Sequence, residues 1–305
     1  MKKIILIAIA LISSQYNCNA QQQPQFTHYM YNTIAVNPGY TGSRDALAIN
    51  AVNRNQWVGF DDEVPRTTTI SVHSPLRNEN MGLGISVMHD QSGYENFSYV
   101  YADYSYTIKV KEDHHLAFGV KAGFSQYKID PELFTYQEVL NDPYFQDQLN
   151  RWTPNVGVGM YYHTEKWYAG LSSPRILNND YNKDSEYVAL EQNHYYLIGG
   201  YVFDMTSNTK FRPSFSTKYT SGAPLSVEGS AVFLFYEKFW LGASYRVDDA
   251  IGALFDFKLN KQFRIGYAFE YPVTDIARYT SGTHEVMLIY EFKYNNSRYK
   301  SPRYF

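Results

Sequence analysis

From residue 45 onward the chain carries two rhythms that together leave few folds open. Strand-like stretches alternate apolar and polar side chains: Phe263, Ile265, Tyr267 and Phe269 are separated by small or charged residues. The connections between such stretches alternate between long and short. A transmembrane β-barrel needs both rhythms, because lipid contacts every second residue of each strand and the two rims carry connections of different length. A soluble sandwich accounts only for the first rhythm.

The alternation predicts an all-β fold, an antiparallel transmembrane β-barrel of about fourteen strands. On the second face of the C-terminal strands lie charged residues and glycines, which suit a wet or tightly packed interior. An even strand number places both ends of the barrel at one rim, expected to be the periplasmic one. The expected strands are 45–52, 66–73, 82–89, 97–108, 114–125, 153–162, 166–172, 194–205, 210–219, 225–236, 239–247, 251–258, 263–271 and 284–293.

The long connections, notably 126–152 and 173–193, are expected at the outer rim, and turns such as 206–209 and 237–238 at the periplasmic rim. The short connection 248–250 is an exception on the outer side. The alternative fold is a pair of soluble, secreted β-sandwiches, whose strands also alternate. We disfavour it because no Pro/Gly-rich linker divides the chain, and because bulky apolar residues keep to one face while many glycines lie on the other.

The first twenty residues have the form of a signal peptide. Two lysines precede the apolar run from Ile4 to Ile12, and Cys18-Asn19-Ala20 has the small-x-small form of a cleavage site. The run is too short to span a bilayer, which needs about 20 residues. We therefore predict a signal peptide at 1–20, a lead at 21–44, a barrel at 45–293 and a tail at 294–305. Cys18 could carry a lipid, but bulky polar residues precede it.

Composition agrees with export to the outer membrane. The only cysteine lies in the predicted signal peptide, so the mature chain is expected to have no disulfide. Its 30 Tyr, 19 Phe and 4 Trp suit the headgroup level of a membrane, although Tyr also favours strands generally. A net charge of −3 is too small to indicate a nucleic-acid partner. Membrane lipid is the expected surrounding.

The sequence offers no convincing catalytic, metal or cofactor site. His89-Asp90 and His114-His115 fall at expected strand ends, and no serine lies in a G-x-S-x-G turn. The acidic run Asp61-Asp62-Glu63 lacks the spacing of an EF-type calcium loop. We predict that the protein is not an enzyme and binds no cofactor; a lipid hydrolase is the enzymatic alternative.

Glycines recur at alternate strand positions, as in Gly82-Leu83-Gly84 and Gly157-Val158-Gly159. They do not form a phosphate-binding loop. We expect them to relieve crowding inside the curved wall.

Two irregular segments break the rhythm. The aromatic-rich lead 25–32 runs into the turn Asn37-Pro38-Gly39; we expect it either to plug the periplasmic mouth or to dock a partner. The segment 53–60 falls in the first expected outer loop or in the lumen. Its Trp57 and Phe60 suit interfacial anchors, and its Arg54 and Gln56 suit a fixed packing site.

These segments carry a resemblance to a known family. Residues 24–32, 37–42 and 54–60 resemble the PorP/SprF family of outer-membrane proteins of the Bacteroidetes type IX secretion system. Gly39 stands where the family often has Ala. The similarity spans nearly the whole mature chain, continuing through 71–75, 82–84, 90–93, 101–104 and 282–288.

The resemblance implies a non-enzymatic barrel that acts with the secretion machinery. Family members are associated with secretion or surface attachment of a particular cargo, such as a gliding adhesin with its own class of C-terminal signal domain. The implied partners are a cargo C-terminal domain and other type IX or periplasmic components. A general porin for small solutes is the alternative, because fourteen strands can enclose a water-filled lumen with charged inner residues such as Arg246, Arg264 and Glu270.

Two sets of residues are candidate partner contacts. Aromatics in the loop 126–152 form one set because aromatic side chains are enriched in interface cores; alternatively this loop folds inward and closes the barrel. The family-motif set is Asn37, Pro38, Gly39, Tyr40, Gly42, Arg54, Gln56, Trp57, Gly59 and Phe60. The loop set is Tyr136, Tyr144, Phe145 and Trp152.

Overall fold

A computed structural model describes residues 24–44, 46–60, 64–130, 150–179 and 191–292. The predicted signal peptide, the tail 294–305 and most of the loop 126–152 lie outside these residues.

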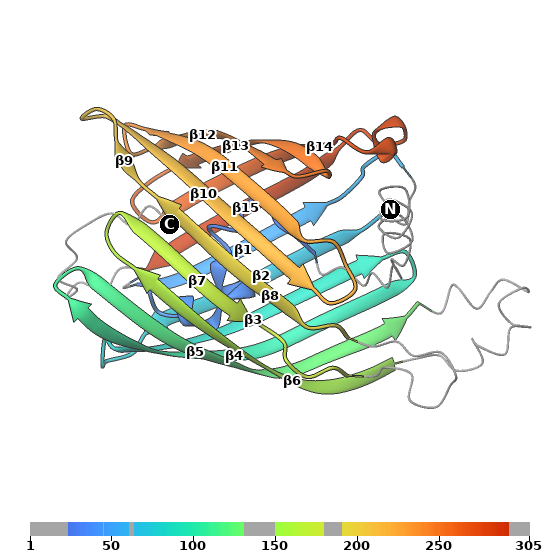
Figure 1. Ribbon diagram of the computed structural model, residues 1–305, viewed down its shortest axis with the longest axis horizontal. Helices are drawn as coiled ribbons and strands as arrows, with labels where there is room; N and C mark the ends of the chain where they lie inside the picture. The colour runs from blue at the N-terminus through green and yellow to red at the C-terminus, as the bar shows by residue number, and fades with distance from the viewer. Residues whose placement is uncertain (1–23, 45, 61–63, 131–149, 180–190, 293–305) are drawn as a thin grey trace, which may run out of the picture.

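One antiparallel sheet closes on itself as a barrel (Figure 1). The first strand, β1, pairs with β2 and with the last strand, β15, and the pairing of β10 with β11 completes the ring. β8 and β9 pair with β10 in one register, Gly200 opposite Ser214 and Phe203 opposite Phe211. They form a single wall strand, interrupted beside Pro213, which has no N–H to donate. In the described part the fifteen strand segments therefore make a fourteen-stranded wall, which confirms the predicted barrel.

The strands are β1 Leu47–Asn55, β2 Arg66–Pro75, β3 Met81–Ser92, β4 Glu95–Lys111, β5 His114–Ile129, β6 Asn150–His163, β7 Trp167–Ser173, β8 His194–Tyr201, β9 Phe203–Asp204, β10 Thr209–Thr220, β11 Ser226–Phe235, β12 Phe239–Arg246, β13 Ala250–Lys258, β14 Phe263–Pro272 and β15 Thr283–Phe292. The short helices are α2 Thr33–Val36, η1 Pro38–Tyr40 and η4 Asp275–Arg278.

The connections define two rims. One, the long-connection rim, carries the connections 56–65, 130–149, 174–193 and 273–282, together with the shorter 93–94, 221–225 and 247–249. The other, the short-turn rim, carries turns such as 112–113, 205–208 and 236–238, and also the start of β1 and the end of β15. The alternation of connection lengths expected from the sequence holds for the longest connections. The connection 93–94 is an exception, because it is much shorter than the expected 90–96.

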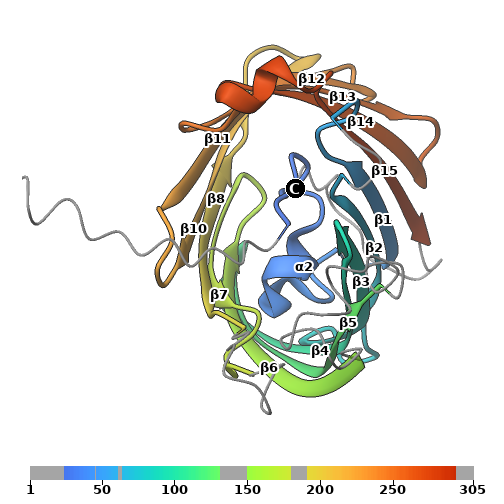
Figure 2. The ribbon, with the colours of Figure 1, turned by 90° about the vertical axis from the view of Figure 1, so that its right-hand side faces the viewer.

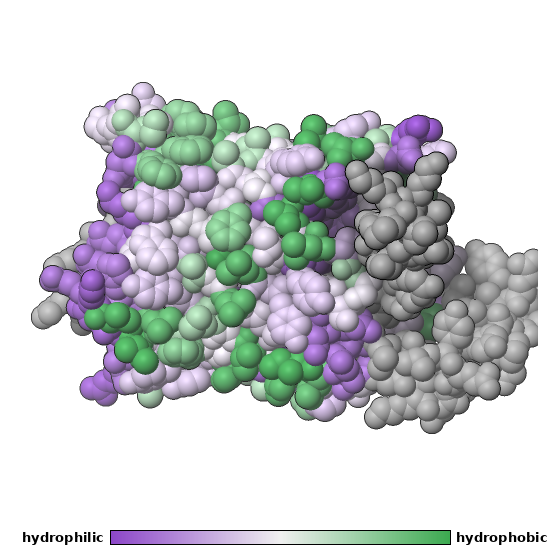
Figure 3. Space-filling model, viewed as in Figure 1, coloured by the Kyte–Doolittle hydropathy of each residue, from purple (hydrophilic) through white to green (hydrophobic). Residues whose placement is uncertain are grey.

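The outward face of the wall is apolar. Along β14 the exposed Ile265, Tyr267 and Tyr271 alternate with the buried Arg264 and Glu270. Figure 3 shows hydrophobic and weakly polar side chains between the two ends of the wall, where hydrophilic residues gather. An apolar surface of this extent is far larger than soluble monomers expose, and it fits lipid. No helix among the described residues is long and apolar enough to cross a membrane.

Aromatic rings cluster on the outward face near the short-turn rim. The ring centroids of Tyr201 and Phe203 lie 4.4 Å apart, and those of Phe211 and Phe233 lie 4.8 Å apart. Phe203 and Phe211 link the two pairs at 6.2 Å. Such a row across neighbouring strands fits the aromatic girdle of outer-membrane barrels at the headgroup level.

The lead fills the lumen. Figure 2 looks into the barrel from the long-connection rim, and α2 lies inside the ring of strands. Met30, Tyr31, Ile34 and Tyr40 are no more than 2% exposed. Met30 and Tyr31 pack with wall residues including Leu254, Met287 and Ile289. The predicted plug-like lead is confirmed, and it occupies the interior rather than the periplasmic mouth alone.

Inward-facing glycines of the wall make room for the lead. A Cβ atom on Gly82 would lie 2.3 Å from the Thr41 carbonyl oxygen, and one on Gly119 would lie 2.2 Å from the Gly39 nitrogen. A Cβ on Gly159 would lie 2.1 Å from Asn37 Oδ1. We call Gly82, Gly119 and Gly159 the glycine seat. The sequence predicted glycines that relieve crowding, and the crowding element is the lead.

A methyl group in the glycine seat should therefore destabilise the barrel. For Gly119→Ala we expect a loss of about 1–3 kcal/mol, because the added methyl overpacks against lead backbone. Urea unfolding in detergent measures the loss, with the folded fraction read from the difference in gel mobility between the folded and the heat-unfolded barrel. Gly229→Ala is the matched control, since nothing lies within 4 Å of its Cβ position. Equal midpoints for the two variants would contradict a fixed contact between lead and wall.

Candidate functional site

The candidate site is the interface between the lead and the inner wall. At its centre is the buried carboxylate of Glu285 on β15. It accepts hydrogen bonds from the backbone N–H groups of Thr27 and His28, at 3.0 and 2.8 Å. His28 Nδ1 lies 2.7 Å from the same carboxylate. One wall residue thus holds two consecutive lead residues through both backbone and side chain.

A chain of ion pairs continues from Glu285 around the wall. Arg54 of β1 contacts Glu285 at 3.3 Å and also pairs with Glu270 of β14. Arg246 of β12 binds Glu270 and Glu228 of β11, each at 2.9 Å. All five side chains are buried. Because a buried charge is costly without a partner, this mutual pairing is what allows them to lie in the interior.

His28 adds a positive charge to this network. Its Nε2 atom lies 3.0 Å from Asp256 Oδ1 on β13, while Nδ1 faces Glu285. Burial favours the neutral imidazole, but the two carboxylates outweigh burial and raise the pKa of His28 to about 10. His28 is therefore an imidazolium at neutral pH, held between two carboxylates. The network thus joins the lead to six wall strands, β1 and β11 to β15.

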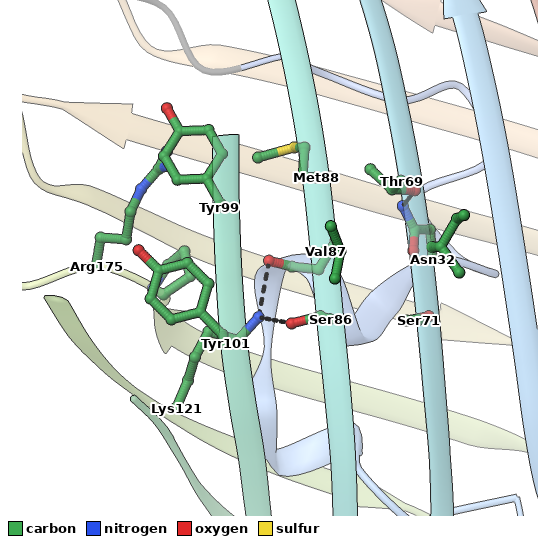
Figure 4. Close-up of a pocket in the computed structure, with 13 residues that line it drawn as sticks. Asn32, Thr69, Ser71, Ser86, Val87, Met88, Tyr99, Tyr101, Lys121 and Arg175 are labelled. Carbon is green, nitrogen blue, oxygen red and sulfur yellow. Dashed lines mark hydrogen bonds between the residues drawn. The ribbon is translucent and has the colours of Figure 1, made fainter. Parts of the chain in front are cut away.

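A second polar cluster holds the middle of the lead. Lys121 Nζ donates to the carbonyl of Ile34 at 3.0 Å and pairs with Asp103 at 3.2 Å. Ser86 donates to Asp103 at 2.7 Å. Figure 4 shows Lys121 directed at Ser86, with Tyr99 and Tyr101 side by side near Arg175. In this cluster a lysine satisfies carbonyl groups at the end of α2, which would otherwise be buried without donors.

The residues around this second cluster line a cavity of about 30 Å³ between the lead and β2 to β5. The hydroxyl of Ser71 reaches it without a hydrogen-bond partner in the structure. A space of this size holds about two water molecules. The cavity is therefore suited to water rather than to a solute.

The turn of the lead is bonded to the wall on several sides. Asn37 donates from Nδ2 to the Met160 carbonyl at 3.0 Å, and its Oδ1 accepts from the Gly39 N–H at 2.9 Å. The ring of Tyr40 lies edge-on to Tyr161, with centroids 5.3 Å apart. Gly42, at φ +74°, donates to His73 Nδ1 at 3.0 Å. The Asn-Pro-Gly signal thus marks a fixed turn rather than a flexible one.

The structure divides the family-motif set between two places. Asn37, Pro38, Gly39, Tyr40 and Arg54 are buried against the chain's own wall. Gly42, half-buried, closes the same turn. In this conformation these residues face no outside partner, and the contact role predicted for them stays a prediction. Arg54, expected in an outer loop or the lumen, lies on β1, which continues through Asn55, and its side chain points into the lumen.

The rest of the set lies at the long-connection rim. The N–H of Gln56 donates to the Pro65 carbonyl at 2.9 Å, and that of Trp57 to Thr283 Oγ1 at 3.2 Å. Gly59 adopts φ +88°. Phe60 is 51% exposed and meets Tyr279 edge-on, with ring centroids 6.1 Å apart. This rim segment presents the Phe60–Tyr279 aromatic pair to the surroundings.

The loop set is placed differently from the expectation. β5 extends through Ile129 and β6 begins at Asn150, so Trp152 belongs to the wall and not to a loop. Its side chain is 55% exposed on the outward face. The loop assignment of Trp152 is corrected: cross-strand pairing with Gln126 places it on the sheet. Tyr136, Tyr144 and Phe145 lie outside the described residues.

Sequence reasoning missed the residues that fold the ends of the 174–193 connection inward. Asn155 Oδ1 accepts from the N–H groups of Ile176 and Leu177, both at 3.1 Å. Asn155 Nδ2 donates to Glu191 at 2.9 Å, and Glu191 pairs with Arg175 at 3.1 Å. The Arg175 guanidinium lies 4.1 Å from the Tyr99 ring centroid. The one sequence signal for this inward fold was Asn155, an amide side chain at an inward-facing strand position.

Breaking the buried network should cost much more than breaking an exposed pair. For Arg54→Leu we expect a loss of about 3–5 kcal/mol, because Glu270 and Glu285 keep buried charge with a lost partner. Arg278→Leu is the control, since its pair with Asp275 is largely exposed and should contribute little. Chemical unfolding in detergent measures both. Similar midpoints for the two variants would contradict a stabilising role for the network.

The stability of the barrel should also depend on His28 in alkaline solution. The pKa of His28 is 6.5 when unperturbed and about 10 in the folded protein. Folding therefore takes up a proton between these values, so the contribution is complete below pH 6.5 and is lost as the pH rises through 10. We expect the unfolding midpoint to fall from pH 7 to pH 10. His28→Gln should fall less over the same range; an equal fall would rule out the imidazolium.

Comparison with known proteins identifies a family to which the chain is similar. The model of the family described as type IX secretion system membrane protein PorP/SprF matches residues 18–290. No curated protein sequence matches the chain.

Among solved structures, the CymD monoaromatic hydrocarbon channel is similar, with 9% identity over 87% of this chain and 94% of that one, at a TM-score of 0.53. The toluene transporter TbuX of Ralstonia pickettii is 10% identical over 86% of this chain and 93% of its own, at a TM-score of 0.51. At such identities the two structures show a shared barrel fold alone. The family match over most of its length shows that this chain belongs to the PorP/SprF family of type IX secretion system membrane proteins.

Proposed function

We propose that this protein is a filled, non-conducting outer-membrane barrel that holds a cargo domain or a machinery component of the type IX secretion system. The observation that carries the proposal is the packed lumen. Inward side chains as far apart as Asp103, Arg212 and Glu270 are at most 3% exposed. A water-filled channel would leave its wall accessible to solvent. A barrel without a channel fits an attachment role better than a transport role.

The surroundings of the lumen support a non-enzymatic role. The charged side chains of the Glu285 network and of the Lys121 cluster pair with one another and with the lead. The cavities that Lys121 and Glu228 line have a volume of only about 30 Å³ each. The part of the chain that the structure describes holds no cluster of three or more His, Cys, Asp or Glu placed for a metal. We propose secretion or surface attachment of one cargo protein, of the gliding-adhesin kind, through its C-terminal domain.

The long-connection rim is the surface that we assign to this partner. Its Phe60–Tyr279 pair is exposed yet held in place: the Val58 N–H donates to the Gly282 carbonyl at 2.8 Å, and the Ser281 N–H donates to the Val58 carbonyl at 2.7 Å. A rigid, exposed aromatic pair loses little side-chain entropy on binding, which favours it as an anchor.

Transport of small solutes is the second candidate. CymD and TbuX, which share the fold, are described as a hydrocarbon channel and a toluene transporter. The cavities beside the lead are the feature of this chain that favours such a role, but each has a volume of only about 30 Å³. A solute would first have to displace the lead.

Conductance and partner capture together test the proposal. The purified mature protein should be silent in a planar bilayer and should retain a secreted C-terminal domain encoded beside it. Phe60→Ala should weaken that capture about tenfold or more, as expected for an aromatic anchor. Trp152→Ala is the matched control, since Trp152 has a similar exposed fraction but lies on the outward wall. The Trp152→Ala variant should bind normally. A stable pore of solute size would overturn the proposal.

A further inference from the structure

The two ends of the lead lie at opposite rims of the barrel. Gln25 Nε2 donates to Ser226 Oγ at 3.0 Å. Ser226 is the first residue of β11, directly after the connection 221–225 on the long-connection rim. At the other end Arg44 pairs with Glu291 at 2.6 Å. Glu291 lies one residue before the end of β15, on the short-turn rim.

Contacts between these ends follow the length of the lumen in order. Thr27 and His28 bond to Glu285, the third residue of β15 from the long-connection rim. Ile34 then meets Lys121 near the middle of β5. Thr41 accepts from Ser105 Oγ at 2.6 Å, and its carbonyl faces Gly82 at the short-turn end of β3. The lead therefore crosses the lumen once and does not fold back.

The crossing is fixed and not loosely inserted. Phe26, Tyr29, Met30 and Tyr31 are buried in one apolar cluster with the wall. Burial of these side chains against the wall stabilises the docked lead. The glycine seat and the Glu285 network hold the remaining segments. Pulling the lead out towards the start of β1 would break all of these contacts.

We propose that the lead is threaded through the barrel, so that its N-terminal end, at Pro24 and Gln25, is displayed on the cell exterior as part of the surface that meets extracellular partners. Outer-membrane barrels place long loops outside and short turns in the periplasm. The strand β1 begins at the short-turn rim, so the segment that precedes it would ordinarily be expected to lie in the periplasm. Here the lead crosses the lumen before β1 begins, so its N-terminal end lies at the long-connection rim instead.

Threading also constrains how the barrel forms. A segment whose two ends lie at opposite mouths cannot enter a closed ring sideways. The lead must therefore lie among the strands before β1 pairs with β15, or its end must travel the whole lumen. The exposure of the N-terminal end of the lead at the cell exterior does not depend on whether a cargo domain binds this barrel.

Thiol labelling of intact cells tests the threading. Gln25→Cys and Ser43→Cys are a matched pair, because both residues belong to the lead, are half-buried and lie at its opposite ends. The sole native cysteine, Cys18, is replaced by serine so that each variant has one thiol. A small membrane-impermeant thiol reagent should label position 25 at least tenfold more than position 43 in intact cells. After detergent lysis the two should label alike.

An epitope inserted directly before Pro24 gives a second measurement that does not depend on substitution in the lumen. It should bind antibody on intact cells, whereas the same epitope in the short turn 205–208 should bind only after permeabilisation. Preferential labelling of position 43, equal labelling of both positions in intact cells, or an epitope before Pro24 that is hidden until permeabilisation would overturn the proposal.

Discussion

The contact between the Glu285 carboxylate and the lead is the interaction on which the rest of the structure depends. Glu285 lies on the last strand, and its ion-pair partner Arg54 lies on the first. Thr27 and His28, which donate hydrogen bonds to Glu285, belong to the lead. One buried side chain thus joins the seam that closes the barrel to the segment that fills it. Its cost of desolvation is met by two backbone N–H groups, one imidazolium and one guanidinium.

In a barrel surrounded by lipid, the outer surface is apolar, whereas in a soluble protein the interior is apolar. Many apolar residues of the wall face outward, and many inner positions carry polar and charged groups that need partners. Porins meet this need with water. This chain meets it with its own lead, whose backbone and side chains pair with the wall, and with ion pairs between neighbouring strands. This pairing fills the interior, and the filled interior is the observation behind the proposed attachment role.

The sequence was sufficient to predict the barrel and much less informative about the site. Alternation in segments such as 263–271 reports directly which face a residue occupies, so the strands and their number were predicted correctly. The lead was recognised as irregular and aromatic. Its contacts were not predictable, because His28 and Glu285 are 257 residues apart and no local pattern couples them. The role of the inward glycines was visible only once the lead was seen against them.

Two strands are longer at one end than the sequence predicted, for a common physical reason. The first strand was expected to end at residue 52 and the sixth to begin at residue 153, which assigned Trp152 to a loop and left Arg54 in either an outer loop or the lumen. Strand ends carry no sharp signal where polar or aromatic residues continue the pairing. The ladder with β15 carries β1 through Asn55, and the ladder with β5 starts β6 at Asn150. Long-range pairing set these boundaries, and local propensity did not.

Hydrogen–deuterium exchange of the protein in detergent tests most directly whether the lead is a permanent core. Amides along the lead are bonded to the wall or within the lead itself: Thr27 and His28 to Glu285, Gly42 to His73, and Asn32 to the His28 carbonyl. We predict that peptides covering residues 26–42 exchange as slowly as those from β4 and β5. Exchange as fast as that of the exposed turn 205–208 would contradict a barrel that is permanently filled by its own lead.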